Sequence, residues 1–254
     1  MSKLATLLRR AGRTEPAPMG FSLGGNRAKS PGMLVTVILD DLDQAAAAAA
    51  VKAGAETLLF DKADLDKDAE KIRALTASVD VPCGLRLTKP AAKAAAAARG
   101  LGLDYLRIDD DAPAALLLDE EEGFVFAVEE DASDTFLRTL DSMFVDALYV
   151  GEIEAPFTLR RQLELRRLSG FARKPLVVLA GNPLNSEDLE CLRDAGVAAV
   201  MIAAGGGLDK QLASLRASIE AMRPRRRRRN DRQDSVAVLP SVGHAEDDEG
   251  EEEE

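Results

Sequence analysis

Histidine and the large aromatic residues are almost missing from this chain. Of its 254 residues only His244 is a histidine, none is tryptophan, and aromatic residues make up 4%. A Ser–His–Asp hydrolase, a Cys–His protease and a histidine-ligated metal site each need a histidine in the folded part of the chain, and His244 falls in a terminal segment that we expect to be unfolded. The scarcity of aromatics also argues against nucleic-acid binding by base stacking.

Cysteine and long apolar segments are scarce as well. Cys83 and Cys191 are too few for a disulfide framework or a thiolate zinc site, and we interpret both as small core residues. No apolar run approaches the roughly 18 residues that a membrane helix needs, and Arg9 and Arg10 follow the short leucine cluster near the start. The sequence therefore predicts no membrane association and no export signal, and a cytoplasmic location is expected.

What the chain does have is a regular alternation of short apolar runs with longer helix-favouring segments. Eight runs rich in Val, Ile, Leu and Phe indicate strands at residues 34–40, 56–61, 82–87, 104–109, 124–129, 147–151, 175–180 and 198–203. The runs are continuously apolar, which is typical of parallel strands covered on both faces. Because no Gly-x-Gly-x-x-Gly turn follows the first run, the pattern favours a parallel (β/α)₈ barrel over an open doubly wound sheet.

Three domains or segments follow from this pattern. Residues 1–33 contain one short amphipathic helix and an irregular lead-in, and the helix either covers the bottom of the barrel or forms a tethered arm. Residues 34–222 form the barrel. Its weakest point is the fourth crossover, residues 110–122, where only a short helix fits and a hairpin is the competing interpretation.

The third segment, residues 223–254, has a different composition from the barrel. It carries seven arginines followed by acidic residues, ten in all, and blocks of like charge cannot bury enough apolar surface to fold. We therefore expect a disordered tail. Its eight clustered terminal carboxylates and the net negative barrel repel phosphate backbones, so a protein partner for residues 223–254 is favoured over nucleic acid.

Carboxylates follow five of the eight predicted strands. In parallel barrels the functional site lies at the carboxyl ends of the strands, so these acids should gather around one opening. We expect Asp40, Asp109 and Glu129 to do acid–base work and Lys62 or Arg86 to stabilise negative charge. Clustered acids would also suit Mg²⁺, with Asp109, Glu129 and Glu152 as the ligands. The competing interpretation is that such an Asp caps the helix that follows.

The last two units carry the most specific pattern. Strand residues 175–180 lead into Gly181-Asn182-Pro183, and strand residues 198–203 lead into Gly205, Gly206 and Gly207. Over residues 174–222 the chain resembles the ribulose-phosphate-binding type of barrel, a group that contains enzymes of tryptophan and histidine biosynthesis and sugar-phosphate lyases and epimerases. The resemblance implies a phosphate held by Gly181, Asn182 and Gly205 to Gly207. The sequence departs from the group where Pro183 removes an amide donor and where Ala203 and Ala204 replace glycine.

Two functions fit these features. The first is an enzyme of the lyase or isomerase type that binds a small phosphorylated or carboxylated metabolite at the carboxyl-terminal rim. The second is a barrel without catalysis that serves as a scaffold or regulator through its charged tail. The acids on one rim favour the first, whereas the missing histidine favours the second.

Overall fold

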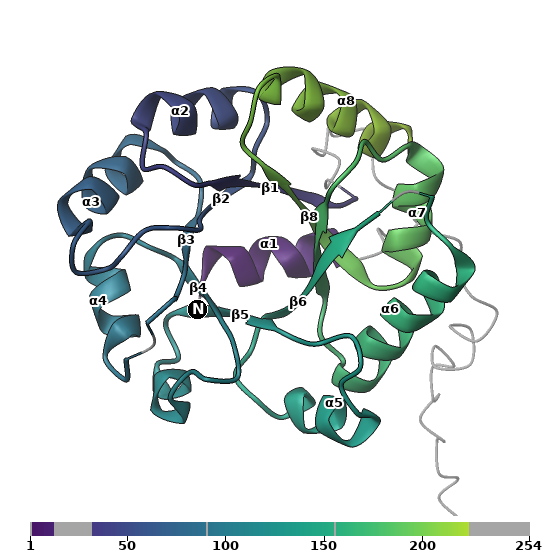
Figure 1. The fold of residues 1–254 in the computed structure, drawn as a ribbon, viewed down its shortest axis with the longest axis horizontal. Coiled ribbons are helices and arrows are strands. Elements are labelled where there is room, and N and C mark those ends of the chain that lie inside the picture. The colour runs from purple at the N-terminus through teal and green to yellow at the C-terminus, as the bar shows by residue number, and fades with distance from the viewer. Residues whose placement is uncertain (1, 13–31, 90, 155, 224–254) are drawn as a thin grey trace, which may run out of the picture. The chain divides into compact units, whose positions relative to one another are not determined.

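The computed structural model describes residues 2–12, 32–89, 91–154 and 156–223. Eight parallel strands form a closed barrel in the order of the sequence, and β8 pairs with β1 to complete it (Figure 1). The strands are β1 Leu34–Leu39, β2 Thr57–Phe60, β3 Cys83–Arg86, β4 Tyr105–Ile108, β5 Gly123–Ala127, β6 Ala147–Ile153, β7 Leu176–Ala180 and β8 Val197–Ala203. The predicted (β/α)₈ barrel is confirmed.

Helices surround this ring of strands. Those on the outside are α2 Gln44–Lys52, α3 Ala69–Ser78, α4 Ala94–Gly100, α5 Asp134–Asp141, α6 Leu159–Ala172, α7 Ser186–Asp194 and α8 Leu208–Ala221. Local sequence starts several of them: the side chains of Asp43, Ser133 and Thr158 accept hydrogen bonds from amides of the first turns of α2, α5 and α6. Asn185 and Asp188 form a reciprocal capping box at α7.

The fourth crossover contains a short 3₁₀ helix, η1 Ala114–Leu118. The strands that it connects, β4 and β5, are parallel, with Tyr105 beside Gly123 and Ile108 beside Phe126. A hairpin would have made them antiparallel, so the short-helix interpretation is the one that the structure supports.

Two apolar layers hold the barrel together. Alternate strand residues face outward and pack under the helices, while the others fill the interior, among them Leu34, Leu59, Val125 and Val177. Both layers are buried, which explains why the strands read as continuous apolar runs in the sequence. Tyr105 is the largest interior side chain, and its hydroxyl donates to the carbonyl oxygen of Leu58 at 2.8 Å.

The N-terminal helix α1, Lys3–Gly12, closes the amino-terminal end of the barrel. Leu4 and Leu8 belong to the interior cluster and are almost fully buried. The carboxylate of Asp104, just before β4, accepts hydrogen bonds from the amides of Lys3 and Leu4 at 2.8 Å each and so anchors the start of α1. In Figure 1 the helix is seen across the ring of strands.

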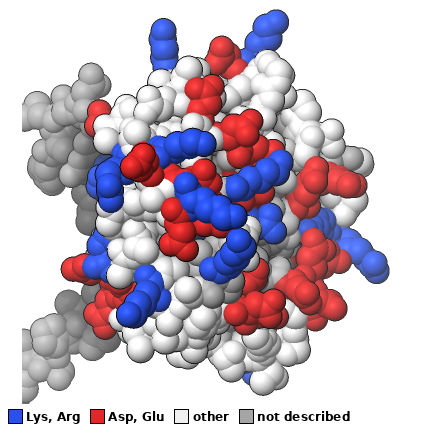
Figure 2. Space-filling view, turned by 60° about the vertical axis from the view of Figure 1, so that its left-hand side comes forward, with Lys and Arg blue, Asp and Glu red and all other residues white. Residues whose placement is uncertain are grey.

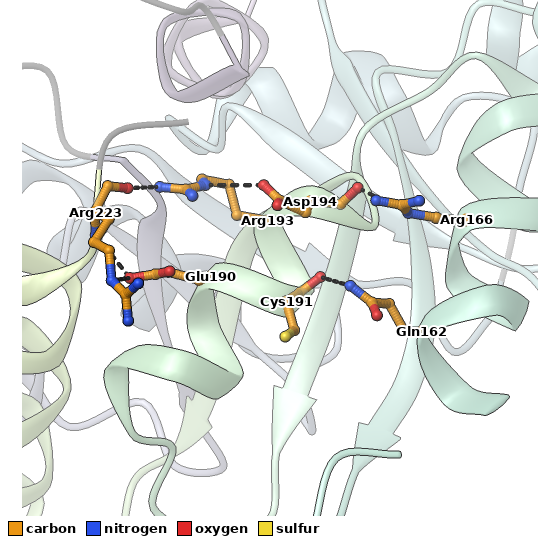
Figure 3. A network of polar contacts seen from close by, with 7 residues as sticks. All are labelled: Gln162, Arg166, Glu190, Cys191, Arg193, Asp194 and Arg223. Carbon is orange, nitrogen blue, oxygen red and sulfur yellow. Dashed lines mark hydrogen bonds and ion pairs between the residues drawn. The ribbon is translucent and has the colours of Figure 1, made fainter. Parts of the chain in front are cut away.

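Polar contacts fix the end of α8 to its neighbour α7 (Figure 3). The amide of Arg223 donates to Glu190 Oε1 at 2.8 Å, and the Arg193 guanidinium donates to the carbonyl oxygen of Arg223 at 2.6 Å. Gln162 and Arg166 on α6 donate to carbonyl oxygens of α7. These contacts tie three consecutive helices together at the point where the described chain ends.

The chain divides into two units, Met1–Arg223 and Pro224–Glu254. The second unit, on which the prediction of a disordered tail and of a tail-bound partner rests, lies outside the described residues. Among the helices of the described part, none is both long and apolar enough to cross a membrane.

Candidate functional site

The mouth at the carboxyl-terminal end of the barrel is built from side chains of β2, β3 and β4. Tyr105 faces the interior, and a side chain at Gly84 would collide with its ring, so Gly84 faces the interior too. Arg86 and Arg107 lie two residues further along the same strands and are register partners, so both face the mouth. Asp61 follows β2 directly and reaches both arginines.

Asp61 forms ion pairs with two guanidinium groups. Its Oδ2 lies 3.3 Å from Arg86 Nη1, and its Oδ1 lies 3.6 Å from Arg107 Nη1. One carboxylate cannot neutralise two cations, so this group of three side chains keeps a net positive charge. We call Asp61, Arg86 and Arg107 the mouth cluster.

Arg107 is the most enclosed member of the mouth cluster. Its side chain is 12% exposed, against 44% for Arg86. The guanidinium carbon lies 4.1 Å from the centre of the Tyr149 ring on β6, a cation–π contact that joins β4 to the second strand along the barrel wall. Burial, with a contribution from Arg86, lowers the pKa of Arg107, although an arginine stays charged at neutral pH. A buried excess cation of this kind is stabilised when an anion binds.

Two lysines lie further out on the rim: Lys62, which was predicted to stabilise negative charge, and Lys89. Lys62 pairs with Asp40 at 2.5 Å, and the hydrogen bond between them raises the pKa of Lys62. Lys89 pairs with Asp64 at 3.2 Å, and hydrogen bonds from the amides of Asp66 and Lys67 lower the pKa of Asp64. Figure 2 shows acidic and basic side chains interleaved in this way over one face of the molecule.

A cleft of about 170 Å³ lies beside the mouth cluster, between the loops that follow β2 and β3. Arg86 belongs to both, because its side chain lines the cleft and pairs with Asp61. Lys89 and Lys93 add two more cations to the lining, opposed by Asp64 and Asp66. Beyond Arg86 the charges of the lining balance, so the cleft adds paired charges of both signs beside the mouth cluster.

The predicted acid–base residues lie at the rim rather than inside the mouth. Asp40, Asp109 and Glu129 are exposed, and Asp40 is engaged with Lys62. Within the described ranges, no three Asp, Glu, Cys or His side chains gather closely enough to hold a metal ion. Asp109, Glu129 and Glu152 thus do not make a preformed metal site, and Mg²⁺ binding stays a prediction from the sequence.

Glu152 occupies a different position from the one expected of a metal ligand. A β-carbon built on Gly181 would lie 1.8 Å from Glu152 Oε1, so the carboxylate fills the space directly over Gly181. Gly181 was expected to bind phosphate together with Asn182. A carboxylate in contact with this loop repels a phosphate, so the geometry disfavours that role for Gly181.

The loop after β8 is open. Side chains built on Gly205 or Gly206 would meet nothing within 4 Å, and all three glycines of the loop are exposed. Gly207 has φ +84° and caps α8, a conformation that favours glycine. This loop leaves backbone amides beside the first turn of α8, which is the arrangement that the sequence predicted for an anion.

Sequence reasoning missed Arg107 and Tyr149, whose side chains are in contact in the mouth. Both lie inside predicted strands, whereas the functional residues were predicted at the strand ends and just beyond them. The available signal was the alternation of side chains along a strand. Arg107 lies two residues after Tyr105, so the two side chains point to the same face, and an inward Tyr105 places Arg107 inside the barrel. An inward arginine on a buried strand is unusual enough to mark a site.

Comparisons with known proteins address the fold. No family model and no curated protein sequence matches the chain. Solved structures do match: 3-keto-L-gulonate-6-phosphate decarboxylase from Vibrio cholerae has a TM-score of 0.63 at 12% identity, over 76% of this chain and 99% of that one. This chain is a TIM barrel.

Two further solved structures agree with that assignment. Thiamine phosphate pyrophosphorylase from Pyrococcus furiosus has a TM-score of 0.56 at 14% identity, over 74% of this chain and 95% of that one. A mutant tryptophan synthase alpha-subunit from the same organism has a TM-score of 0.56 at 15% identity, over 75% and 97%. At such low identity the similarity establishes the fold, and the function of this TIM barrel has to be argued from its own side chains.

Proposed function

We propose that this TIM barrel binds a small metabolite through a carboxylate or phosphate group that is held in the mouth by Arg86 and Arg107. The observation that carries the proposal is the sharing of Asp61 by two guanidinium groups, one of them largely buried. The unbalanced positive charge lies at the end of the barrel where ligands of this fold bind. Structurally similar proteins whose names include phosphorylated compounds agree with an anionic ligand.

Tyr149 and Asp61 prepare Arg107 for this role. The ring fixes one face of the guanidinium and the carboxylate takes one edge, which leaves the other donors oriented before a ligand arrives. Planar guanidinium groups bind carboxylate and phosphate oxygens in pairs, so a fixed arginine favours these anions over chloride. Little side-chain entropy is then lost on binding.

Arg107→Met tests the proposal by isothermal titration with acetate, succinate and inorganic phosphate. A hydrogen bond to a charged group contributes about 1.5–3 kcal/mol, so we expect affinity for the tightest anion to fall about 10-fold to 100-fold. The matched control is Arg138→Met, because Arg138 also stacks on an aromatic ring, Phe171, but does so on the outer helix α5. Failure of every anion to bind the wild type, or equal losses in the two variants, would overturn the proposal.

The reaction that we propose for the bound anion is lyase or isomerase chemistry, with Asp109 or Glu129 as the acid–base group and Lys62 stabilising developing charge. Gly206→Asp tests whether the loop after β8 binds the anion instead. The new side chain has open space around it, so the fold is preserved, while its charge repels an anion at that loop. We expect an anion held by Arg86 and Arg107 to bind this variant as it binds wild type, and weaker phosphate binding would place the phosphate at the loop after β8.

A further inference from the structure

Strand β6 contains an irregularity that changes which of its side chains face the mouth. Tyr149 pairs with Val177 of β7, but Glu152, three residues on, pairs with Leu179, only two residues on. One extra residue has been inserted into β6, and Gly151, within the insertion, has φ +92°. This is a β-bulge.

The bulge turns Glu152 inward. Val177 and Leu179 both face the barrel interior, as does Tyr149. In a regular strand the position two residues beyond Tyr149 would face inward and Glu152 would face the helices, because side chains alternate. The inserted residue moves Glu152 onto the inward-facing row, and its carboxylate is found over Gly181.

Glu152 has no hydrogen-bond or ion-pair partner among the described side chains, unlike the rim acids Asp40, Asp61 and Asp64. It lies on the same strand as Tyr149, whose ring contacts Arg107 of β4. The mouth cluster thus carries one more positive than negative charge, with Asp109 acting on Arg107 from the rim, and Glu152 adds an unpaired negative charge at β6. A ligand that carries only an anion would satisfy the first and be repelled by the second.

We propose that the ligand is zwitterionic, with its carboxylate or phosphate on Arg86 and Arg107 and an ammonium group on Glu152. This inference rests on the proposed function and names the class of ligand for the same site. Across the bulge Glu152 pairs only two residues beyond the partner of Tyr149, so the two residues lie about 7 Å apart along β6. A chain of about four to six atoms fits between the two charged groups.

Matched pairs of probes test the ammonium group. Each pair has the same number of non-hydrogen atoms, and one member ends in ammonium and the other in methyl: 4-aminobutyrate with pentanoate, 5-aminopentanoate with hexanoate, and phosphoethanolamine with propyl phosphate. Isothermal titration should give at least one pair in which the amino member binds wild type about 10-fold more tightly.

Two variants locate the preference at Glu152. Glu152→Gln should abolish the preference and improve binding of the methyl members, because a negative charge has left the mouth. Gly181→Ala should also abolish it without changing any charge, since the new methyl group displaces the end of a flexible side chain and leaves the backbone alone. Glu154 is an exposed glutamate directly after β6, and Glu154→Gln is the control that should keep the preference.

The outcomes separate the two proposals. If wild type binds both members of every pair equally, or if Glu152→Gln keeps the preference, the zwitterion inference is wrong while anion binding at Arg107 stands. If no member of any pair binds wild type, the proposed function fails and the inference fails with it.

Discussion

The two ends of this barrel are built from opposite chemistry. At the amino-terminal end, Leu4 and Leu8 of α1 enter the interior cluster and the capped helix closes the opening. At the carboxyl-terminal end, Asp61, Arg86, Arg107 and Glu152 replace apolar side chains in the same interior rows. The amino-terminal end therefore stabilises the fold. The carboxyl-terminal end has less apolar packing, and its charged side chains can contact a ligand.

Glu122 is a buried acidic residue at the amino-terminal end of the barrel, which is otherwise closed by apolar side chains. It is 5% exposed, its Oε1 has no hydrogen-bond partner, and it lies beside Asp104, the residue that anchors α1. Burial, and secondarily the charge of Asp104, raises the pKa of Glu122 to about 8. Ionisation of Glu122 thus opposes its packing at the closed end of the barrel, where burial also raises the pKa of Asp146.

The largest expected effect is at the α1 plug. Leu8→Ala leaves a cavity among side chains of the barrel interior, so we expect the free energy of unfolding to fall by about 2–5 kcal/mol in urea denaturation. Anion affinity at the other end should not change. The control is Leu7→Ala on the same helix, where the side chain is half-buried. A loss no larger than that of the control would mean that α1 does not plug the barrel.

An intermediate effect should come from the ionisation of Glu122. Between its usual pKa of 4.5 and about 8 the folded state holds the proton and the unfolded state does not, so stability is lost as pH rises through this window. Glu122→Gln keeps the shape without the titration. We expect the stability difference between wild type and variant to change by on the order of 2 kcal/mol from pH 5 to pH 9, in favour of the variant at high pH.

Urea denaturation at intervals across this range measures the effect. Glu121→Gln is the matched control, because Glu121 is its exposed neighbour and pairs with Arg99. Parallel curves for wild type and Glu122→Gln would show that Glu122 ionises freely in the folded protein.

The smallest effect is expected at the rim. Lys62 and Asp40 form an exposed ion pair, which water and salt screen, so Lys62→Met should leave the melting temperature within error of wild type. Anion affinity should change much less than in Arg107→Met, because Lys62 lies outside the mouth cluster. A loss of affinity equal to that of Arg107→Met would extend the site to the rim and weaken the contrast between the two arginines and the lysine.

Patterns between residues close in the sequence predicted most of the fold. The continuous apolar runs predicted all eight strands, and short polar residues such as Asp43 and Thr158 cap the helices that follow. The end of β6 was predicted less well: the strand was expected to stop at Gly151, whereas it continues to Ile153 through the bulge. A glycine in a strand indicates either an end or a bulge, and only the pairing with β7 distinguishes them.

The residues of the candidate site were also predicted only in part. Arg86 was predicted from its place at a strand end, and it is found in the mouth. Asp40, Lys62, Asp109 and Glu129 were chosen by the same rule and lie on the exposed rim. Position after a strand gives the end of the barrel but not the direction of a side chain, because that direction depends on the register between strands.

The amino-acid sequence by itself determined the alternation of strands and helices, and with it the closed barrel, because periodicity and capping act between residues close in the chain. Only the tertiary structure decided that Arg107 meets Tyr149 and shares Asp61 with Arg86, and that Glu152 covers Gly181. These contacts join different strands, and the register between the strands and one inserted residue in β6 set them. Periodicity and capping act between residues close in the chain and do not fix that register.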